Sequence, residues 1–248
     1  MDVAIRGDRA GCLTVQLAPQ TWLFAVAAGF GVIDGQACAP ATLGRVRAEC
    51  ERRIRNERFR RAIDRPHAAS SALLGVLAHV NSDLFVRSAA HADYVTAGCS
   101  ISAVLTVRDR GYVVHAGGTA AYLVHDGSVR ALTVDDTFED VPKTLLARAL
   151  GTSANLDVCV SNFALQFGDV VVLVAHRIHG EIDRRSLIAH VEGAAPSEQL
   201  LVVRFDDEDR VHRRGRAPSV RRRNRWMTLA APGAFALCAL LLTMGWAR

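Results

Sequence analysis

Four short strands follow one another between residues 99 and 132 with no helix between them, and this succession constrains the fold most. Apolar residues recur with a period of two along residues 99–107, 111–116, 120–125 and 128–132. Asp126-Gly127 is a tight-hairpin signal between the last two. Parallel strands need a long crossover, usually a helix, so these strands are predicted to be antiparallel.

Two long helical patterns precede these strands, over residues 39–63 and 69–88. Hairpin strands beside two adjacent helices predict an α+β layered sandwich rather than a βαβ fold. The same pattern reading predicts further strands at residues 12–17, 22–28, 158–165, 170–175 and 200–205, and short helices at 142–150 and 184–191.

Charge is divided unevenly along the 248 residues. Residues 210–225 hold eight arginines and no acid, whereas residues 1–209 hold 21 basic and 25 acidic side chains, a balance of −4. An acidic body argues against nucleic acid as a partner.

The six cysteines form no C-x-x-C pair, which disfavours a zinc ribbon or a thioredoxin-type site.

Residues 226–246 form a run of 21 residues without a charge, with Trp226 and Trp246 at its ends. A helix of this length spans roughly the 30 Å hydrocarbon core of a bilayer, and indole rings favour the interface. The alternative is a buried core helix, which needs a core to surround it. We therefore expect a single-pass transmembrane helix.

The preceding linker, residues 207–225, carries the arginine cluster. Positive charge is retained on the cytoplasmic side, so we expect the N-terminal domain to be cytoplasmic. The abundance of arginine over a single lysine, Lys143, suggests a GC-rich bacterium and therefore its inner membrane. Alternatively, the cluster docks an acidic or phosphorylated partner.

Several motifs occur in a characteristic order along residues 5–206. Residues 24–31 (FAVAAGFG) are similar to F-x-V-A-D-G-M-G, and residues 112–123 (YVVHAGGTAAYL) to Y-V-A-H-V-G-D-S-R-A-Y-L. Three further segments are similar to I-T-R-A-L-G, L-x-x-G-D-x-L-L-L and V-V-V-R-F, namely residues 146–151, 165–173 and 201–205. Together they resemble PPM-type (type 2C) protein Ser/Thr phosphatases. This implies that residues 1–206 form a PPM-type α-β-β-α sandwich, trimmed between residues 133 and 146 and between 182 and 200.

The departures from the family pattern concern its chemistry. Family members bind two Mg²⁺ or Mn²⁺ ions through aspartates and a glycine carbonyl, and the metals activate a water. The resemblance places non-carboxylate residues at four of these positions and keeps the carbonyl of Gly29; the four are Ala28, Gly118, His176 and Pro196. A methyl group cannot bind a hard cation. The resemblance therefore implies a degenerate, pseudophosphatase-like member with no metal cofactor and no catalytic residue.

Other residues allow a rebuilt site. Asp34 lies six residues after Ala28 and is either a displaced ligand or part of an Asp34-Gly35 turn. His176 and His179, with His115, could bind zinc, although no cysteine or carboxylate stands beside the pair.

We expect a membrane-anchored, non-catalytic binding or regulatory module for a phosphoprotein, a kinase or a membrane assembly, in which Arg177 and backbone amides could bind an anion. One alternative is an active Ser/Thr phosphatase with a metal site rebuilt from Asp34, His176 or Asp135. The other is a passive spacer on a functional membrane helix.

Overall fold

The computed structural model describes residues 1–6, 9–89, 97–134, 136, 148–178, 182–195 and 197–205. The linker at 207–225 and the expected membrane helix at 226–246, with Trp226 and Trp246, lie outside these residues and stay predictions. Pro196, His179 and Asp135 also lie outside them.

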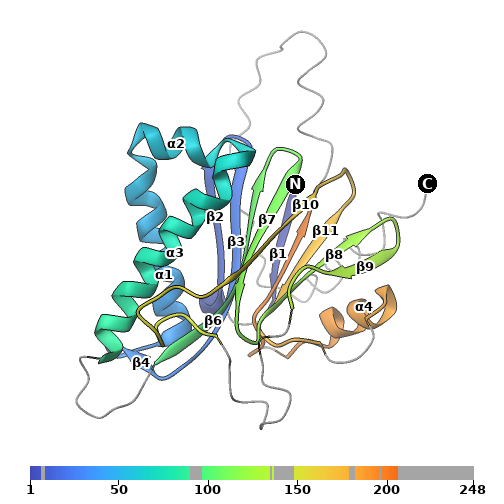
Figure 1. Cartoon of the computed structure of the whole chain (residues 1–248). Coiled ribbons are helices and arrows are strands. Elements are labelled where there is room, and N and C mark those ends of the chain that lie inside the picture. The colour runs from blue at the N-terminus through green and yellow to red at the C-terminus, as the bar shows by residue number, and fades with distance from the viewer. Residues whose placement is uncertain are drawn as a thin grey trace, which may run out of the picture.

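Two five-stranded antiparallel sheets face each other (Figure 1). The first, called the β3 sheet, has the order β10 (Cys159–Ala164), β7 (Arg110–Ala116), β6 (Gly98–Val107), β3 (Thr21–Phe30) and β2 (Cys12–Ala18). The second, the β8 sheet, has the order β1 (Asp2–Arg6), β12 (Leu200–Arg204), β11 (Val170–Val174), β8 (Ala120–His125) and β9 (Ser128–Ala131).

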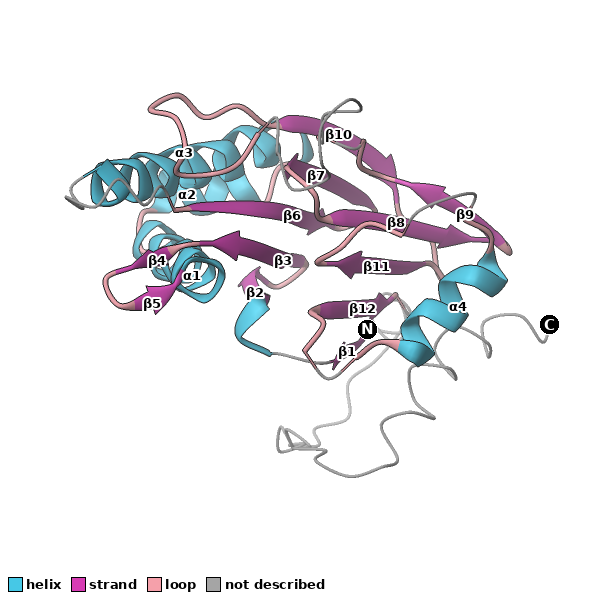
Figure 2. Ribbon diagram, turned by 90° about the horizontal axis from the view of Figure 1, so that it is seen from below, coloured by secondary structure: helices cyan, strands magenta, loops and turns pink. Residues whose placement is uncertain are grey.

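Helices cover the outer face of each sheet. Helices α1 (Cys38–Ile54), α2 (Glu57–Ile63) and α3 (Pro66–Ala89) lie on the β3 sheet, and α4 (Arg184–Gly193) lies on the β8 sheet (Figure 2). This arrangement confirms the predicted α+β layered sandwich.

Alternation along each strand divides the core into three layers. In β3, Leu23 and Ala25 pack toward the helices, whereas Phe24 and Val26 pack between the sheets. The third layer lies between the β8 sheet and α4, where Val172 and its neighbours meet Leu187. A residue's position in a strand therefore tells which layer its side chain enters.

The helix predicted over residues 39–63 is two helices. Asn56 ends the first by capping the second, because its side-chain oxygen accepts hydrogen bonds from the amides of Arg58 (2.9 Å) and Phe59 (3.3 Å). Within the described residues, α3 is the one helix long and apolar enough to cross a bilayer, but it buries Leu73, Leu77 and other side chains against the β3 sheet. It is therefore a core helix.

Two further details differ from the sequence-based expectation. Strand β1 was not predicted, and it pairs with β12 along its whole length. The short helix expected at 142–150 lies mostly outside the described residues, and its last residues are not helical. Leu150 instead exchanges backbone hydrogen bonds with Cys99 at 2.8 and 3.0 Å. Asn81 of α3 accepts a hydrogen bond from the next amide, Gly151, at 2.9 Å, which holds this segment against the helical layer.

Candidate functional site

Ala28 lies near the end of β3 and packs against the core between the two sheets. It is paired in register with Ser100 of β6, and Ser102 of β6 is paired with His115 of β7. By strand alternation these side chains all point between the sheets. The apolar inter-sheet core therefore gives way to polar residues at this end, which is where the family motif has its aspartates and this chain has Ala28.

Gly29 is required by the backbone that surrounds it. A Cβ at this position would lie 2.8 Å from the amide nitrogen of Ala39 and 3.0 Å from the Cβ of Cys38. The first turn of α1 thus packs directly on the end of β3. Any side chain at position 29 would displace α1, which explains a glycine here independently of metal binding.

Ser100 joins Ala28 to the turn between β7 and β8. Its Oγ accepts a hydrogen bond of 3.1 Å from the amide of Gly118. The carbonyl of Gly118 in turn accepts one of 3.2 Å from the amide of Arg177, the residue after His176. The structure therefore brings Ala28, Gly29, Gly118 and His176 to one end of the sandwich, although they are separated by up to 148 residues in sequence.

The last predicted position, Pro196, lies outside the described residues, but the chain after it returns to this end. The carbonyl of Gln199 accepts a hydrogen bond of 2.9 Å from the amide of Ala175. The side chain of Gln199 also packs so closely on Gly11 that a Cβ there would lie 2.1 Å from its Cγ. Residues near both ends of the domain thus meet beside the end of β11.

A buried polar network lies next to these positions. The Ser102 hydroxyl shares hydrogen bonds with His115 Nδ1 (3.0 Å) and with the Thr119 hydroxyl (2.8 Å). Asp136 accepts a hydrogen bond of 3.1 Å from the amide of Gly117, and its other oxygen lies 3.2 Å from a guanidinium nitrogen of Arg148. The carboxylate of Asp136, which is 4% exposed, is therefore already neutralised within the protein.

His115 is the least satisfied member of this network. Its Nε2 is buried without a hydrogen bond and lies 3.7 Å from the carboxylate of Asp136. Burial lowers the pKa of His115 below its ordinary value, and the carboxylate of Asp136 offsets this only in part. The imidazole is therefore neutral at pH 7.

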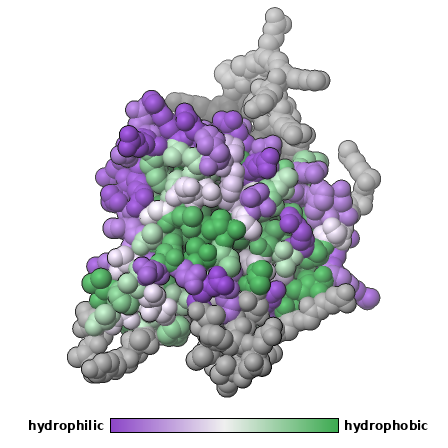
Figure 3. All heavy atoms as spheres, viewed as in Figure 1, coloured by the Kyte–Doolittle hydropathy of each residue, from purple (hydrophilic) through white to green (hydrophobic). Residues whose placement is uncertain are grey.

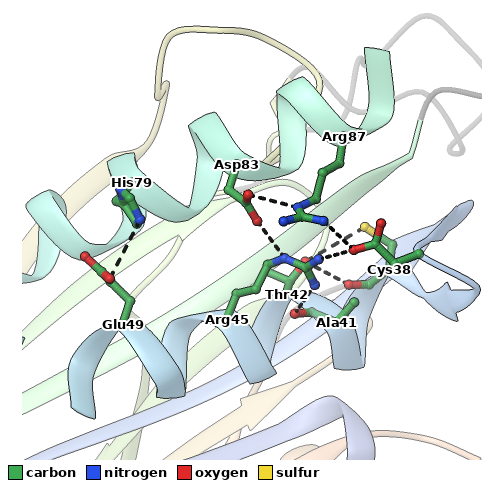
Figure 4. Close-up of polar contacts among 9 residues, drawn as sticks. Cys38, Ala41, Thr42, Arg45, Glu49, His79, Asp83 and Arg87 are labelled. Atoms are coloured by element: carbon green, nitrogen blue, oxygen red, sulfur yellow. Dashed lines mark hydrogen bonds and ion pairs between the residues drawn. The ribbon is translucent and has the colours of Figure 1, made fainter. Parts of the chain in front are cut away.

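Asp34 belongs to a different feature. It occupies the turn between β4 (Val32–Ile33) and β5 (Gln36–Ala37) with φ of 51°, which confirms the turn interpretation. Its carboxylate lies 2.6 Å from Arg45 of α1 and 2.8 Å from Arg87 of α3. Figure 4 shows the two arginines, which Asp83 also bridges at 2.8 and 2.9 Å. Asp34 thus ties the hairpin to two helices, and its charge is balanced there.

Mg²⁺ and Mn²⁺ prefer several oxygen ligands, usually including carboxylates. Among the residues that the structure describes, no group of three or more His, Cys, Asp or Glu side chains is placed to hold a metal ion. At the Ala28 end the groups that could bind a metal are hydroxyls, backbone groups, the imidazoles of His115 and His176, and the paired carboxylate of Asp136. These described residues do not fit a binuclear centre of hard cations.

Sequence reasoning missed the Ser102–His115–Asp136 network. One signal was present: residues 108 and 109 form the hairpin turn between β6 and β7, and this register places Ser102 opposite His115. No pattern could have placed Asp136, because it meets Gly117 and Arg148 through tertiary contacts alone.

No protein-family model matches the sequence, and no curated protein matches it. Solved structures do match. The serine/threonine phosphatase PstP/Ppp of Mycobacterium tuberculosis aligns with 83% of this chain and 98% of its own, at 18% identity and a TM-score of 0.57. PppA of Pseudomonas aeruginosa, described as a key regulatory component of T6SS, aligns with 82% of this chain and 96% of its own, at 19% identity and a TM-score of 0.59.

The serine/threonine phosphatase of S. agalactiae aligns over its whole length with 83% of this chain, at 15% identity and a TM-score of 0.61. Identities this low show the fold alone, and the expected trimming stays a prediction. The chain therefore has the fold of the bacterial PPM-type protein Ser/Thr phosphatases.

Proposed function

We propose that this chain is a membrane-anchored, non-catalytic PPM-type domain that binds a partner. The observation that carries the proposal is the chemistry of the Ala28 end. The positions that converge there offer a methyl group, two glycines and an imidazole, and the nearby carboxylate of Asp136 is held by Arg148 and the Gly117 amide. Nothing in this set offsets the cost of stripping water from a divalent cation.

An end without metals still has groups that bind anions. Arg177 lies there, half-buried, beside the glycine-rich turn between β7 and β8. The amides of Gly117 and Gly118 are already bonded to Asp136 and Ser100, so the guanidinium of Arg177 is the group here that favours phosphate or carboxylate ligands. The partner class is therefore a phosphoprotein, a kinase or a component of a membrane assembly. The description of PppA as a regulatory component is compatible with such a role.

The anchor in this proposal is the charge-free segment 226–246, with the domain on the cytoplasmic side of a bacterial inner membrane. Alkaline carbonate extraction of membranes from cells that express the full chain tests this part. The chain should stay in the pellet, and protease added to spheroplasts should leave the domain intact. Release into the supernatant would reject the anchor.

A phosphatase assay tests the catalytic part separately. The purified full chain should not hydrolyse p-nitrophenyl phosphate or a phosphothreonine peptide above the rate of a blank, with or without Mn²⁺. Turnover that depends on Mn²⁺ and disappears in His176→Ala would instead establish the alternative, an active phosphatase with a rebuilt metal site.

A further inference from the structure

A basic surface lies at one end of the helical layer. Residues 52–65, which include α2, hold seven arginines and two acids, a balance of +5. The remainder of residues 1–209 therefore balances at −9, because residues 1–209 together balance at −4. We call α2 with its flanking arginines and Arg108 the α2 pole. Positive charge is concentrated there on an otherwise acidic domain.

Half of the arginines of the α2 pole are free to bind a ligand, and the others, Arg52, Arg53, Arg61 and Arg108, pair with acidic side chains. Arg58, Arg60 and Arg65 are exposed and form no ion pair with any described residue. A groove of about 680 Å³ runs between α2 and the turn between β2 and β3. Its charged lining residues are four arginines and two acids, namely Arg60, Arg61, Arg65, Arg108, Glu57 and Asp64. Figure 3 shows hydrophilic residues gathered over this end of the helical layer.

The described chain ends at the same end of the sandwich. The amide of Leu165 donates a hydrogen bond of 2.9 Å to the backbone carbonyl of Asp109, which follows Arg108 in the turn between β6 and β7. A few residues later, the amide of Gly168 donates one of 2.8 Å to Phe205. Phe205 therefore lies at the end that carries the α2 pole, and residues 206–248 follow it. Figure 1 agrees, because the N-terminal end of β1, which pairs with the end of β12, lies at the same end of the sandwich as α2.

The Ala28 end is the opposite one. Thr21, the first residue of β3, donates a hydrogen bond of 3.1 Å from its hydroxyl to Asp64, just after α2. Ala28 lies seven residues further along the same strand, a distance of roughly 23 Å. The α2 pole and the Ala28 end thus lie at opposite ends of the sandwich, and the carboxylate of Asp136 beside the Ala28 end is paired with Arg148.

We propose that the α2 pole docks on the anionic lipid headgroups of the membrane that holds residues 226–246, so that the Ala28 end faces away from the bilayer. The proposal rests on the membrane anchor of the proposed function. The 20 residues from 206 to 225 keep the domain close to the surface. Guanidinium groups bind phosphate in a bidentate manner, and each one near an anionic leaflet favours docking by about fivefold.

Hydrogen–deuterium exchange of the full chain tests this. The chain is compared in nanodiscs of phosphatidylcholine alone and of phosphatidylcholine with phosphatidylglycerol. In the anionic discs, amides of α2 and of the turn at residues 108–109 should exchange at least about fivefold more slowly. High salt should abolish the difference, because it screens charges beyond a few ångströms.

Matched charge reversals locate the surface. Arg58→Glu with Arg65→Glu should abolish the protection of α2. Arg130→Glu with Arg185→Glu, two exposed arginines on β9 and α4, changes the net charge equally and should leave the protection intact. Both pairs are exposed and outside the core, so both variants should fold.

Equal exchange of α2 in the two kinds of disc would overturn the proposal, and would leave an acidic protein as the ligand to test. An equal effect of the two double variants would overturn it too. Flotation of the full chain with neutral vesicles in high salt tests the anchor by itself. If the chain does not float, the membrane anchor of the proposed function is rejected. Hydrogen–deuterium exchange of the chain with and without added anionic vesicles then still decides whether the α2 pole binds lipid.

Discussion

Glu49 provides a quantitative test of how the helical layer is held together. It lies in α1 with a side chain only 6% exposed, and its carboxylate is 2.7 Å from Arg52 and 2.5 Å from Arg53. His79 of α3 lies 3.8 Å from the same carboxylate, and Figure 4 shows His79 pointing toward Glu49. The Arg52 guanidinium has the largest effect on the pKa of Glu49, and Arg53 adds to it. Together they outweigh burial and lower this pKa from 4.5 to about 2.

This pKa sets the size and the pH dependence of the effect. A folded pKa of about 2 against 4.5 corresponds to about 3 kcal/mol of stability at pH 7. Because Arg52 is 64% exposed, solvent screening lowers this, and we expect Glu49→Gln to cost about 2 kcal/mol. The pKa is lowered by folding, so the stabilisation is nearly complete above pH 4.5 and is lost as the pH falls toward 2; about 40% should remain at pH 3.

The assay is urea unfolding of the full chain in mild detergent, followed by far-ultraviolet circular dichroism at pH 7 and at lower pH. Glu57→Gln is the matched control, because Glu57 also pairs with an arginine four residues on but is 64% exposed. It should cost less than about 0.5 kcal/mol. Equal costs for the two variants, or a Glu49→Gln deficit that does not shrink at low pH, would refute the reasoning.

Two further predictions use other parts of the domain. The 2.7 Å hydrogen bond from His125 to Asp169 raises the pKa of His125 above 6.5. The stabilisation that this bond gives the fold is therefore complete below pH 6.5 and declines as the pH rises through the folded pKa. An NMR titration should show the pKa of His125 falling back toward 6.5 in Asp169→Asn, and an unchanged value would contradict the assignment. In urea unfolding, Gly117→Ala should destabilise the fold by more than Gly168→Ala. Both glycines have positive φ (89° and 84°), so both substitutions strain the backbone. Of the two, only Gly117 would place its Cβ against another group, the Ser100 hydroxyl at 2.2 Å. Equal losses would show that the crowding at Gly117 relaxes freely.

Periodicity predicted most of the fold because the spacing of apolar residues along each strand and helix depends on which of its faces are buried. The continuous apolar run at residues 22–28 indicates a strand packed on both faces, and the apolar stripe of α1 indicates a helix packed on one face. The break at Asn56 was missed because the apolar spacing continues across it, while the cap is a local hydrogen bond. Strand β1 was missed because its pairing with β12 joins residues some 200 positions apart.

The candidate site was predictable only in part. The motif order brought Ala28, Gly118 and His176 into consideration, and the structure places them at one end of the sandwich. The role of Ser100 as the link between strands, and the pairing of Asp136 with Arg148, depend on tertiary distances. Sequence patterns report the layer that a residue enters, but not the partner that it meets there.

Calorimetric titration of the full chain with Mn²⁺ at pH 7, against a detergent blank, tests the central claim most directly. The chemistry of the Ala28 end predicts no saturable heat below the millimolar range, in wild type and in His176→Ala alike. Two ions bound with micromolar affinity, and lost in His176→Ala, would contradict it.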